Sequence, residues 1–296
     1  MKLWAIKPPR TLPAERAGTH RATTPSPLFV VNKASPSRVI ALHCSGSGAG
    51  QWRHLGEALG TRYDLFAPEY YGCKSIGPWT GAHAFTLADE AARIISIIDT
   101  ADRKVHLIGH SYGGGVTLRL ALMRPDRIAS LILYEPSAFH LLKDIDIGGA
   151  EALAEILALA CEVASGVMTG DYRGAAAAFV DYWSGIGAWD ALRPELQSDL
   201  TRWVPKAPLD FAALIGERTE PGAYACLRFP VLIIRGGYAP VPTRLIAETL
   251  STLLPSARLA EIAGAGHMGP LTHAAEVNAV IIEHLGGADC PLRRAN

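Results

Sequence analysis

Short apolar runs alternate with amphipathic segments along most of the chain. The apolar runs predict strands at residues 39–42, 64–67, 105–108, 128–134, 231–234 and 258–262. Apolar residues at helical spacing predict helices at residues 51–59, 86–98, 115–123, 243–254 and 273–285. Thr86, with Asp89 three residues later, is typical of the start of a capped helix. Continuously apolar strands separated by helices indicate an α/β fold, a mostly parallel sheet with helices on both faces.

The alternation stops between residues 138 and 226. This stretch predicts helices at residues 151–164, 171–183 and 195–203, and it contains no convincing strand. We interpret it as a helical cap over the carboxyl ends of the strands, where ligands bind in open α/β sheets. Five aromatic residues of the cap are expected mainly to hold it to the core, with one or two facing the substrate: Tyr182, Trp183, Trp189, Trp203 and Phe211.

The predicted domain organisation follows from this interruption. Residues 1–27, rich in proline, threonine and arginine, are expected to form an extended N-terminal arm. Residues 28–137 and 227–296 form the two parts of a core α/β domain, and residues 138–226 form the cap.

Composition favours a soluble globular protein. The chain has 296 residues, 49% of them hydrophobic, and its 28 basic and 28 acidic residues balance, so charge gives no indication of a nucleic-acid partner. The five cysteines are an odd number without C-x-x-C spacing, which disfavours disulfides or structural zinc and favours a reducing cytoplasm. The N-terminus does not read as a secretory signal. No segment is expected to approach the roughly 20 apolar residues that span a bilayer.

The most informative motif is Gly109-His110-Ser111-Tyr112-Gly113, which directly follows the apolar run 105–108. A strand that ends in G-x-S-x-G and turns into a helix is typical of a nucleophile elbow, whose strained turn exposes the serine hydroxyl. Glycines are needed at both ends because a Cβ there would collide with neighbouring backbone. The motif predicts acyl transfer from a carboxylic ester, or a related group, to Ser111.

A serine nucleophile needs an adjacent general base, and His267 is the strongest of the ten histidines. It lies in Gly264-Ala265-Gly266-His267-Met268-Gly269-Pro270, between the last predicted strand and the last predicted helix. The glycines and the proline make a loop that can lower the imidazole onto the carboxyl edge of the sheet. His273, at the start of the helix, is expected to be a cap or surface residue.

From about residue 28 to residue 285, the chain resembles the α/β-hydrolase superfamily. Three segments in the family's order carry the resemblance: Leu42-His43-Cys44-Ser45-Gly46 followed by Trp52, the elbow, and the His267 loop. The resemblance implies an oxyanion hole made by the backbone N–H groups of Ser45 and Tyr112. Cys44 stands where this family commonly has glycine, and we interpret it as a buried small residue rather than a reactive thiol.

The acid that orients the histidine is displaced from its common position in this family. That position is the loop after the strand at 231–234, but residues 235–242 hold no carboxylate, and Glu248 lies inside the next predicted helix. A subset of the family, including some haloalkane dehalogenases, places the acid one strand earlier. There this chain has Glu135, which we predict to be the acid.

Glu135 also preserves the family's chain order of nucleophile, acid and base. The alternatives to it are two carboxylates at the start of the cap, Asp144 and Asp146.

The resemblance implies a serine hydrolase that acts on a carboxylic ester or related acyl substrate through Ser111, His267 and Glu135 and an acyl-enzyme. The serine argues against haloalkane dehalogenases and epoxide hydrolases, which attack with aspartate. Three alternatives stay open: a cofactor-free lyase such as a hydroxynitrile lyase, a C–C hydrolase, and a ligand-binding homologue that has lost catalysis.

We expect a small-molecule, apolar acyl substrate and no cofactor. The sequence lacks H-E-x-x-H and any close His/Cys/Asp cluster, so no metal is expected. It also lacks the glycine-rich nucleotide motifs. Neither nucleic acid nor a membrane is an expected partner, and a monomer and a homodimer are equally compatible with the sequence.

Overall fold

The computed structural model of the chain describes residues 36–289, and the predicted N-terminal arm lies outside them. In this part, six strands form one parallel sheet in the order β2-β1-β3-β4-β5-β6. The α/β fold is therefore confirmed, and every predicted strand is present to within two residues. The strands are β1 (Ser37–Leu42), β2 (Tyr63–Phe66), β3 (Val105–His110), β4 (Ile128–Tyr134), β5 (Val231–Gly236) and β6 (Ala257–Ile262).

Helices cover both faces of the sheet because alternate strand residues point to opposite sides. Val39 and Ala41 of β1 belong to the apolar cluster that includes α1 (Arg53–Leu59) and α11 (Ala274–Asp289). Ile40 and Leu42 belong to the cluster on the other face. That second cluster includes residues of α2 (Leu87–Asp99), α3 (Tyr112–Met123) and α9 (Val241–Leu253).

Local chemistry explains several helix boundaries. Thr86 caps α2 as predicted: its hydroxyl accepts from the N–H of Asp89, whose carboxylate accepts from the N–H of Thr86. The helix expected at 51–59 begins with a 3-10 turn, η1 (Ala49–Trp52), before α1. The helix expected at 273–285 is α11, and a short helix with proline in its first turn, α10 (Gly269–Thr272), precedes it.

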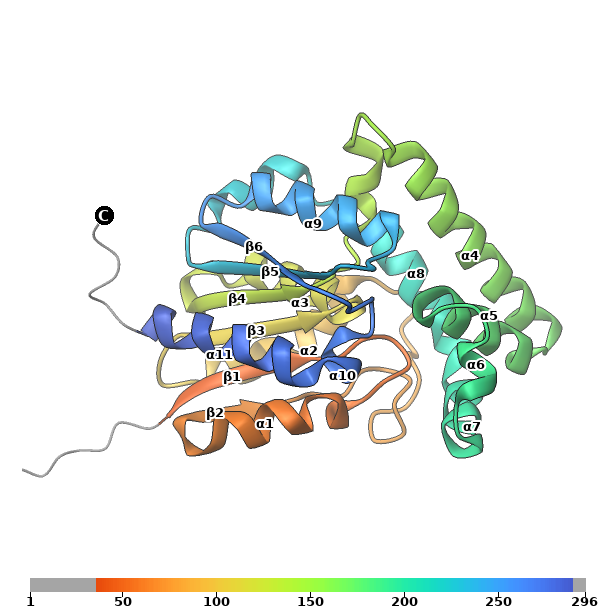
Figure 1. The fold of residues 1–296 in the computed structure, drawn as a ribbon, viewed down its shortest axis with the longest axis horizontal. Coiled ribbons are helices and arrows are strands. Elements are labelled where there is room, and N and C mark those ends of the chain that lie inside the picture. Colours follow the sequence, from red (N-terminus) through yellow and green to blue (C-terminus); the bar gives the residue numbers. More distant parts are fainter. Residues whose placement is uncertain (1–35, 290–296) are drawn as a thin grey trace, which may run out of the picture. The chain divides into compact units, whose positions relative to one another are not determined.

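Between β4 and β5 the described chain is wholly helical or irregular, and we call this part the helical insertion. Figure 1 shows its helices beyond the carboxyl ends of the strands. The sequence pattern missed α6 and α8, both short, and the 3-10 turns. The elements are η4 (Phe139–Asp144), α4 (Gly149–Thr169), α5 (Tyr172–Ser184), α6 (Ala188–Ala191), α7 (Pro194–Trp203), η5 (Val204–Lys206), α8 (Ala207–Ile215) and η6 (Pro221–Cys226).

Helix α4 corrects one expectation from the sequence. It has 21 residues and is long and apolar enough to cross a membrane by length and composition alone, so the statement that no segment approaches a bilayer span is wrong. Ala152, Ile156, Leu159 and Val163 form its buried face. That face recurs every three or four residues, as in an amphipathic helix packed against neighbours, here α5, α8 and α9.

Candidate active site

Ser111 occupies the sharp turn between β3 and α3. Its backbone has φ 56° and ψ −119°, a strained conformation for a residue with a side chain. A Cβ at Gly109 would overlap the Gly113 carbonyl, and a Cβ at Gly113 would overlap the Leu42 carbonyl. These contacts give the physical reason for both glycines of the motif, and the turn has the geometry of a nucleophile elbow.

The structure brings Ser111, His267 and Glu135 into one hydrogen-bonded line. His267 Nε2 lies 2.9 Å from Ser111 Oγ, and His267 Nδ1 lies 2.7 Å from Glu135 Oε2. All three side chains are buried. Because a carboxylate only accepts, Nδ1 carries the proton and Nε2 accepts from the serine hydroxyl.

Glu135 is held in place by backbone and side-chain donors. The Gly236 N–H donates to its Oε1 at 2.9 Å, and the Thr243 hydroxyl donates to its Oε2 at 3.0 Å. Its backbone is also in the positive-φ region, at φ 39°. The other two candidate acids, Asp144 and Asp146, are exposed, and among the described residues neither bonds to His267.

Two side chains, one from β3 and one from β4, donate hydrogen bonds to backbone carbonyls of the loop that carries His267. Tyr134 donates to the Gly266 carbonyl at 2.8 Å, and His110 Nε2 donates to the His267 carbonyl at 2.8 Å. Gln51 donates to the other ring nitrogen of His110 at 3.1 Å. Burial, followed by the nearby His267, holds the pKa of His110 well below its usual range, so this second histidine stays neutral.

Ser45 and Tyr112, the residues expected to supply the oxyanion hole, both line the cavity that contains Ser111. Within residues 36–289, neither backbone N–H donates to a protein acceptor. Two unused donors beside a nucleophile have the character of an oxyanion hole. Both N–H groups are therefore free of protein acceptors in the described part of the chain, as the expected role requires.

A small cavity that opens to solvent lies at Ser111. Ser137, whose hydroxyl is 3.2 Å from that of Ser111, is a lining residue that the sequence did not indicate. Two of the five aromatics expected in the cap, Trp183 and Phe211, line the cavity, whereas Trp189 is buried elsewhere in the insertion. The other lining residues are Ser45, Tyr112, Phe139, Phe179, Asp210 and Leu214.

Cys44 has the surroundings of an inert thiol. It is buried, burial raises its pKa to about 12, and its N–H donates to Gln51 at 3.1 Å. Next to it, His43, Glu69 and Cys73 bring potential metal-ligand atoms within 4.8 Å of one another, a grouping of described residues that the sequence did not indicate. The imidazole of His43 lies 3.3 Å from the Glu69 carboxylate and is the first cause that lowers the pKa of Glu69 to about 2.

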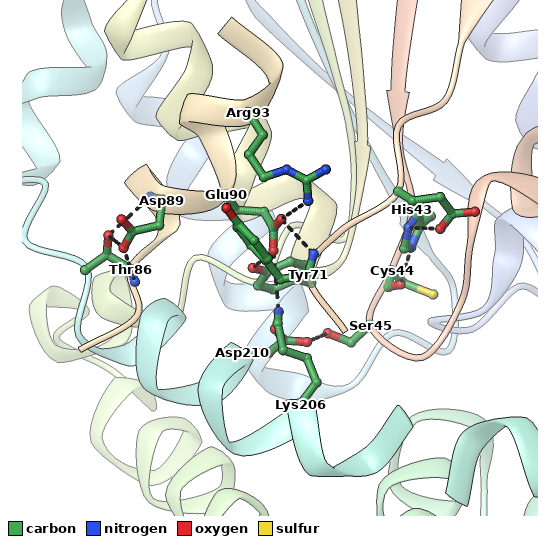
Figure 2. Close-up of polar contacts among 12 residues, drawn as sticks. His43, Cys44, Ser45, Tyr71, Thr86, Asp89, Glu90, Arg93, Lys206 and Asp210 are labelled. Atoms are coloured by element: carbon green, nitrogen blue, oxygen red, sulfur yellow. Dashed lines mark hydrogen bonds and ion pairs between the residues drawn. The ribbon is translucent and has the colours of Figure 1, made fainter. Parts of the chain in front are cut away.

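A buried ionic cluster beside the cavity escaped the sequence analysis. Figure 2 shows Glu90 of α2, Lys206 of η5 and Asp210 of α8 meeting beside Ser45. The Lys206 ammonium contacts the Asp210 carboxylate and lies 3.4 Å from Glu90. The local sequence pattern predicts that each of these charged residues faces solvent, so the sequence did not indicate the cluster.

Comparison with known proteins identifies the family of the chain. The model of the alpha/beta hydrolase family matches residues 39–280. The chain is 30% identical over 105 residues to Lipase LipV of Mycobacterium tuberculosis, covering 35% of this chain and 39% of that protein. It is 28% identical over 247 residues to Polyketide synthase ThaQ of Burkholderia thailandensis, covering 80% of this chain and 11% of that protein. The chain thus spans well under half of the length of these curated relatives.

The fold is also similar to that of an enol-lactonase from Burkholderia xenovorans LB400. The two structures agree with a TM-score of 0.68 at 15% identity, over 86% of this chain and 93% of that one. The match of the family model covers most of the chain, and the sheet and elbow agree with it. The chain therefore belongs to the alpha/beta hydrolase family.

Proposed function

We propose that the protein is a serine hydrolase that cleaves a carboxylic ester or related acyl substrate through an acyl-enzyme. One observation carries the proposal: His267 lies within hydrogen-bond reach of both Ser111 and Glu135, at 2.9 and 2.7 Å. A serine hydroxyl in this arrangement is activated as a nucleophile because the imidazole can take its proton.

The reaction proceeds in two halves. Ser111 Oγ attacks the substrate carbonyl carbon while His267 Nε2 takes its proton, and the N–H groups of Ser45 and Tyr112 donate to the oxyanion. His267 then gives the proton to the leaving group, which leaves the acyl group on Ser111. Water, deprotonated by the same imidazole, attacks the acyl-enzyme and releases the acid. Glu135 holds the imidazole in the required tautomer and stabilises the imidazolium without itself taking the proton.

The cavity supports an apolar acyl group of modest size. Phe139, Phe179, Trp183, Phe211 and Leu214 supply its apolar lining, which suits an apolar acyl group. Two relatives whose names state a reaction, a lipase and an enol-lactonase, act on acyl–oxygen bonds. Both features favour short or medium acyl esters and lactones.

Hydrolysis of p-nitrophenyl esters of increasing acyl length tests the proposal. We expect the wild type to turn over short and medium esters with a burst of p-nitrophenol, and Ser111→Ala to lose turnover while keeping the fold. Ser198→Ala, the same substitution on the exposed surface of α7, is the matched control and should keep full activity. Labelling by a fluorophosphonate should modify Ser111 alone. Full turnover by Ser111→Ala would overturn the proposal.

A further inference from the structure

Both residues that supply the oxyanion N–H groups are tied by their side chains to the same buried ionic cluster. The Ser45 hydroxyl donates to Asp210 Oδ2 at 2.6 Å. The Tyr112 hydroxyl donates to Glu90 Oε2 at 3.1 Å. Lys206 joins the two halves, since its ammonium contacts both carboxylates.

Two members of the cluster come from the helical insertion and one from the core. Lys206 and Asp210 lie on η5 and α8, whereas Glu90 lies on α2 of the core. The Lys206 ammonium also lies 4.9 Å from the ring centroid of Tyr112 and 4.5 Å from that of Phe85. The aromatic faces thus add further contacts that fix the position of the ammonium.

A second contact brings the insertion onto the same loop. Gly46, directly after Ser45, has φ +74°, a conformation that favours glycine. A Cβ there would press against Leu200 and Trp203 of α7. The turn that presents the Ser45 N–H therefore fits closely under the insertion, and its shape depends on where the insertion lies.

The cluster is better suited to set geometry than to stabilise the fold. Glu90, Lys206 and Asp210 are each at most 6% exposed, and the desolvation of buried charges offsets most of their mutual attraction. Burial, the first cause, raises the pKa of Glu90, and Lys206 opposes that shift. Charge-assisted hydrogen bonds are nevertheless short and directional, so they restrict the groups that they join.

We propose that Lys206 and Asp210 are positioning residues of the oxyanion hole. They hold the Ser45 and Tyr112 N–H groups in position relative to each other, so the hole is complete only when the insertion is docked on the core. The inference rests on the proposed function, because it assigns these residues to the stabilisation of an oxyanion. It adds a contribution of the insertion to catalysis beyond covering the substrate.

The test uses two variants that break the cluster from opposite sides, Asp210→Asn and Lys206→Met, assayed with p-nitrophenyl acetate. We expect kcat to fall by about 10- to 100-fold and KM to change by less than about threefold, because only the transition state carries the oxyanion. Asp199→Asn, which removes a carboxylate paired with Arg202 on the exposed surface of α7, is the control and should change neither constant. Rates are divided by the concentration of active sites that a fluorophosphonate titrates, so that misfolded protein does not lower the measured kcat.

A double-mutant cycle adds a readout that a merely structural role would not change. Ser45→Ala keeps the backbone N–H but loses the side-chain link, so Ser45→Ala combined with Asp210→Asn should be no slower than the slower single variant. Phenylboronic acid, whose tetrahedral adduct resembles the intermediate, should bind the variants more weakly by the same factor as the loss of kcat/KM.

The outcomes separate this inference from the proposed function. A wild type that neither turns over esters nor reacts with the fluorophosphonate defeats the proposed function before any variant is assayed. If only the fluorophosphonate reacts, its rate of inactivation replaces kcat in every comparison. Unchanged kcat in both cluster variants, an effect on KM alone, or additive losses with Ser45→Ala would each overturn the inference. If one cluster variant does not fold, the inference is tested with the other cluster variant and with Ser45→Ala. The affinity of each for phenylboronic acid is then compared with that of the wild type.

Discussion

Trp183 of the helical insertion lies against the imidazole of His267, with ring centroids 4.2 Å apart and ring planes tilted by 31°. Only 7% of the Trp183 surface is exposed, and the residue also packs on Phe139 and Tyr182. The indole thus packs against the ring of the proposed base. An aromatic face beside an imidazole favours the protonated ring, the form that arises during acyl transfer.

Replacing Trp183 should therefore lower the rate in a way that depends on the aromatic face. We expect Trp183→Leu to reduce kcat by about 3- to 10-fold, in line with a cation–π contribution of about 0.5–2 kcal/mol. Trp183→Phe should retain most of the rate. Steady-state kinetics, normalised to fluorophosphonate-titratable sites, measure both. Trp189→Leu, a buried tryptophan outside the cavity, is the control, and equal losses in the Leu and Phe variants at position 183 would contradict the prediction.

The identity of the acid can be tested by exchanging a single carboxylate for an amide. Glu135→Gln should lower kcat by about 10²–10⁴, because the amide cannot stabilise the imidazolium and favours the wrong tautomer. Glu248→Gln is the matched control. Glu248 lies in α9, the helix after β5, and its carboxylate is paired with the Arg235 guanidinium at 3.1 Å. A substantial loss in Glu248→Gln, with normal rates in Glu135→Gln, would reassign the acid.

Acid stability should depend on His140, which lies on η4 and is only 4% exposed. Burial lowers its pKa from the usual 6.5 to about 4. The unfolded chain therefore binds a proton that the folded chain does not, so stability is full above about pH 6.5 and falls as the pH drops toward 4. The contribution of one such group is up to about 3 kcal/mol.

Urea unfolding at pH 7 and pH 4.5 measures this effect. The free energy of unfolding should fall from pH 7 to pH 4.5 in both proteins. The fall should be about 1–3 kcal/mol smaller in His140→Gln than in the wild type. The exposed His54→Gln should behave like the wild type. Burial also lowers the pKa of His284 to about 4, so part of the dependence should remain in His140→Gln. An identical decline in all three proteins would contradict the assignment.

Thiol labelling should separate the buried cysteine of the oxyanion loop from the exposed ones. Iodoacetamide at pH 8 should modify Cys161 and Cys226 in the native protein and leave Cys44 unmodified, because a buried thiol with a pKa of about 12 holds almost no thiolate. Mass spectrometry of peptides gives the extent at each site, and labelling in urea shows that Cys44 can react. Early loss of activity on modification of Cys44 would instead indicate a reactive thiol.

Much of the fold and two members of the proposed triad, Ser111 and His267, were predictable because their signals are local. Strands with continuous apolar runs, the capping residues of α2, and the glycines around Ser111 and His267 each act through neighbours in the chain. Glu135 was predicted by a different route, from the absence of a carboxylate in residues 235–242 together with its own place at the end of a strand. Its hydrogen bonds to Gly236 and Thr243, both more than 100 residues away, supply the reason for that position.

What only the tertiary structure decided are the contacts between polar residues that are distant in sequence. Ser45 and Asp210 are 165 residues apart, and Glu90 and Lys206 are 116 apart. A charged residue at one position of a helix leaves the apolar periodicity intact whether it faces solvent or a buried partner, so the pattern carries no information about which occurs. The sequence by itself determined the sheet, the elbow and the histidine loop through short-range sterics and periodicity. The packing of the insertion on the core determined which charges are buried and which loop they hold.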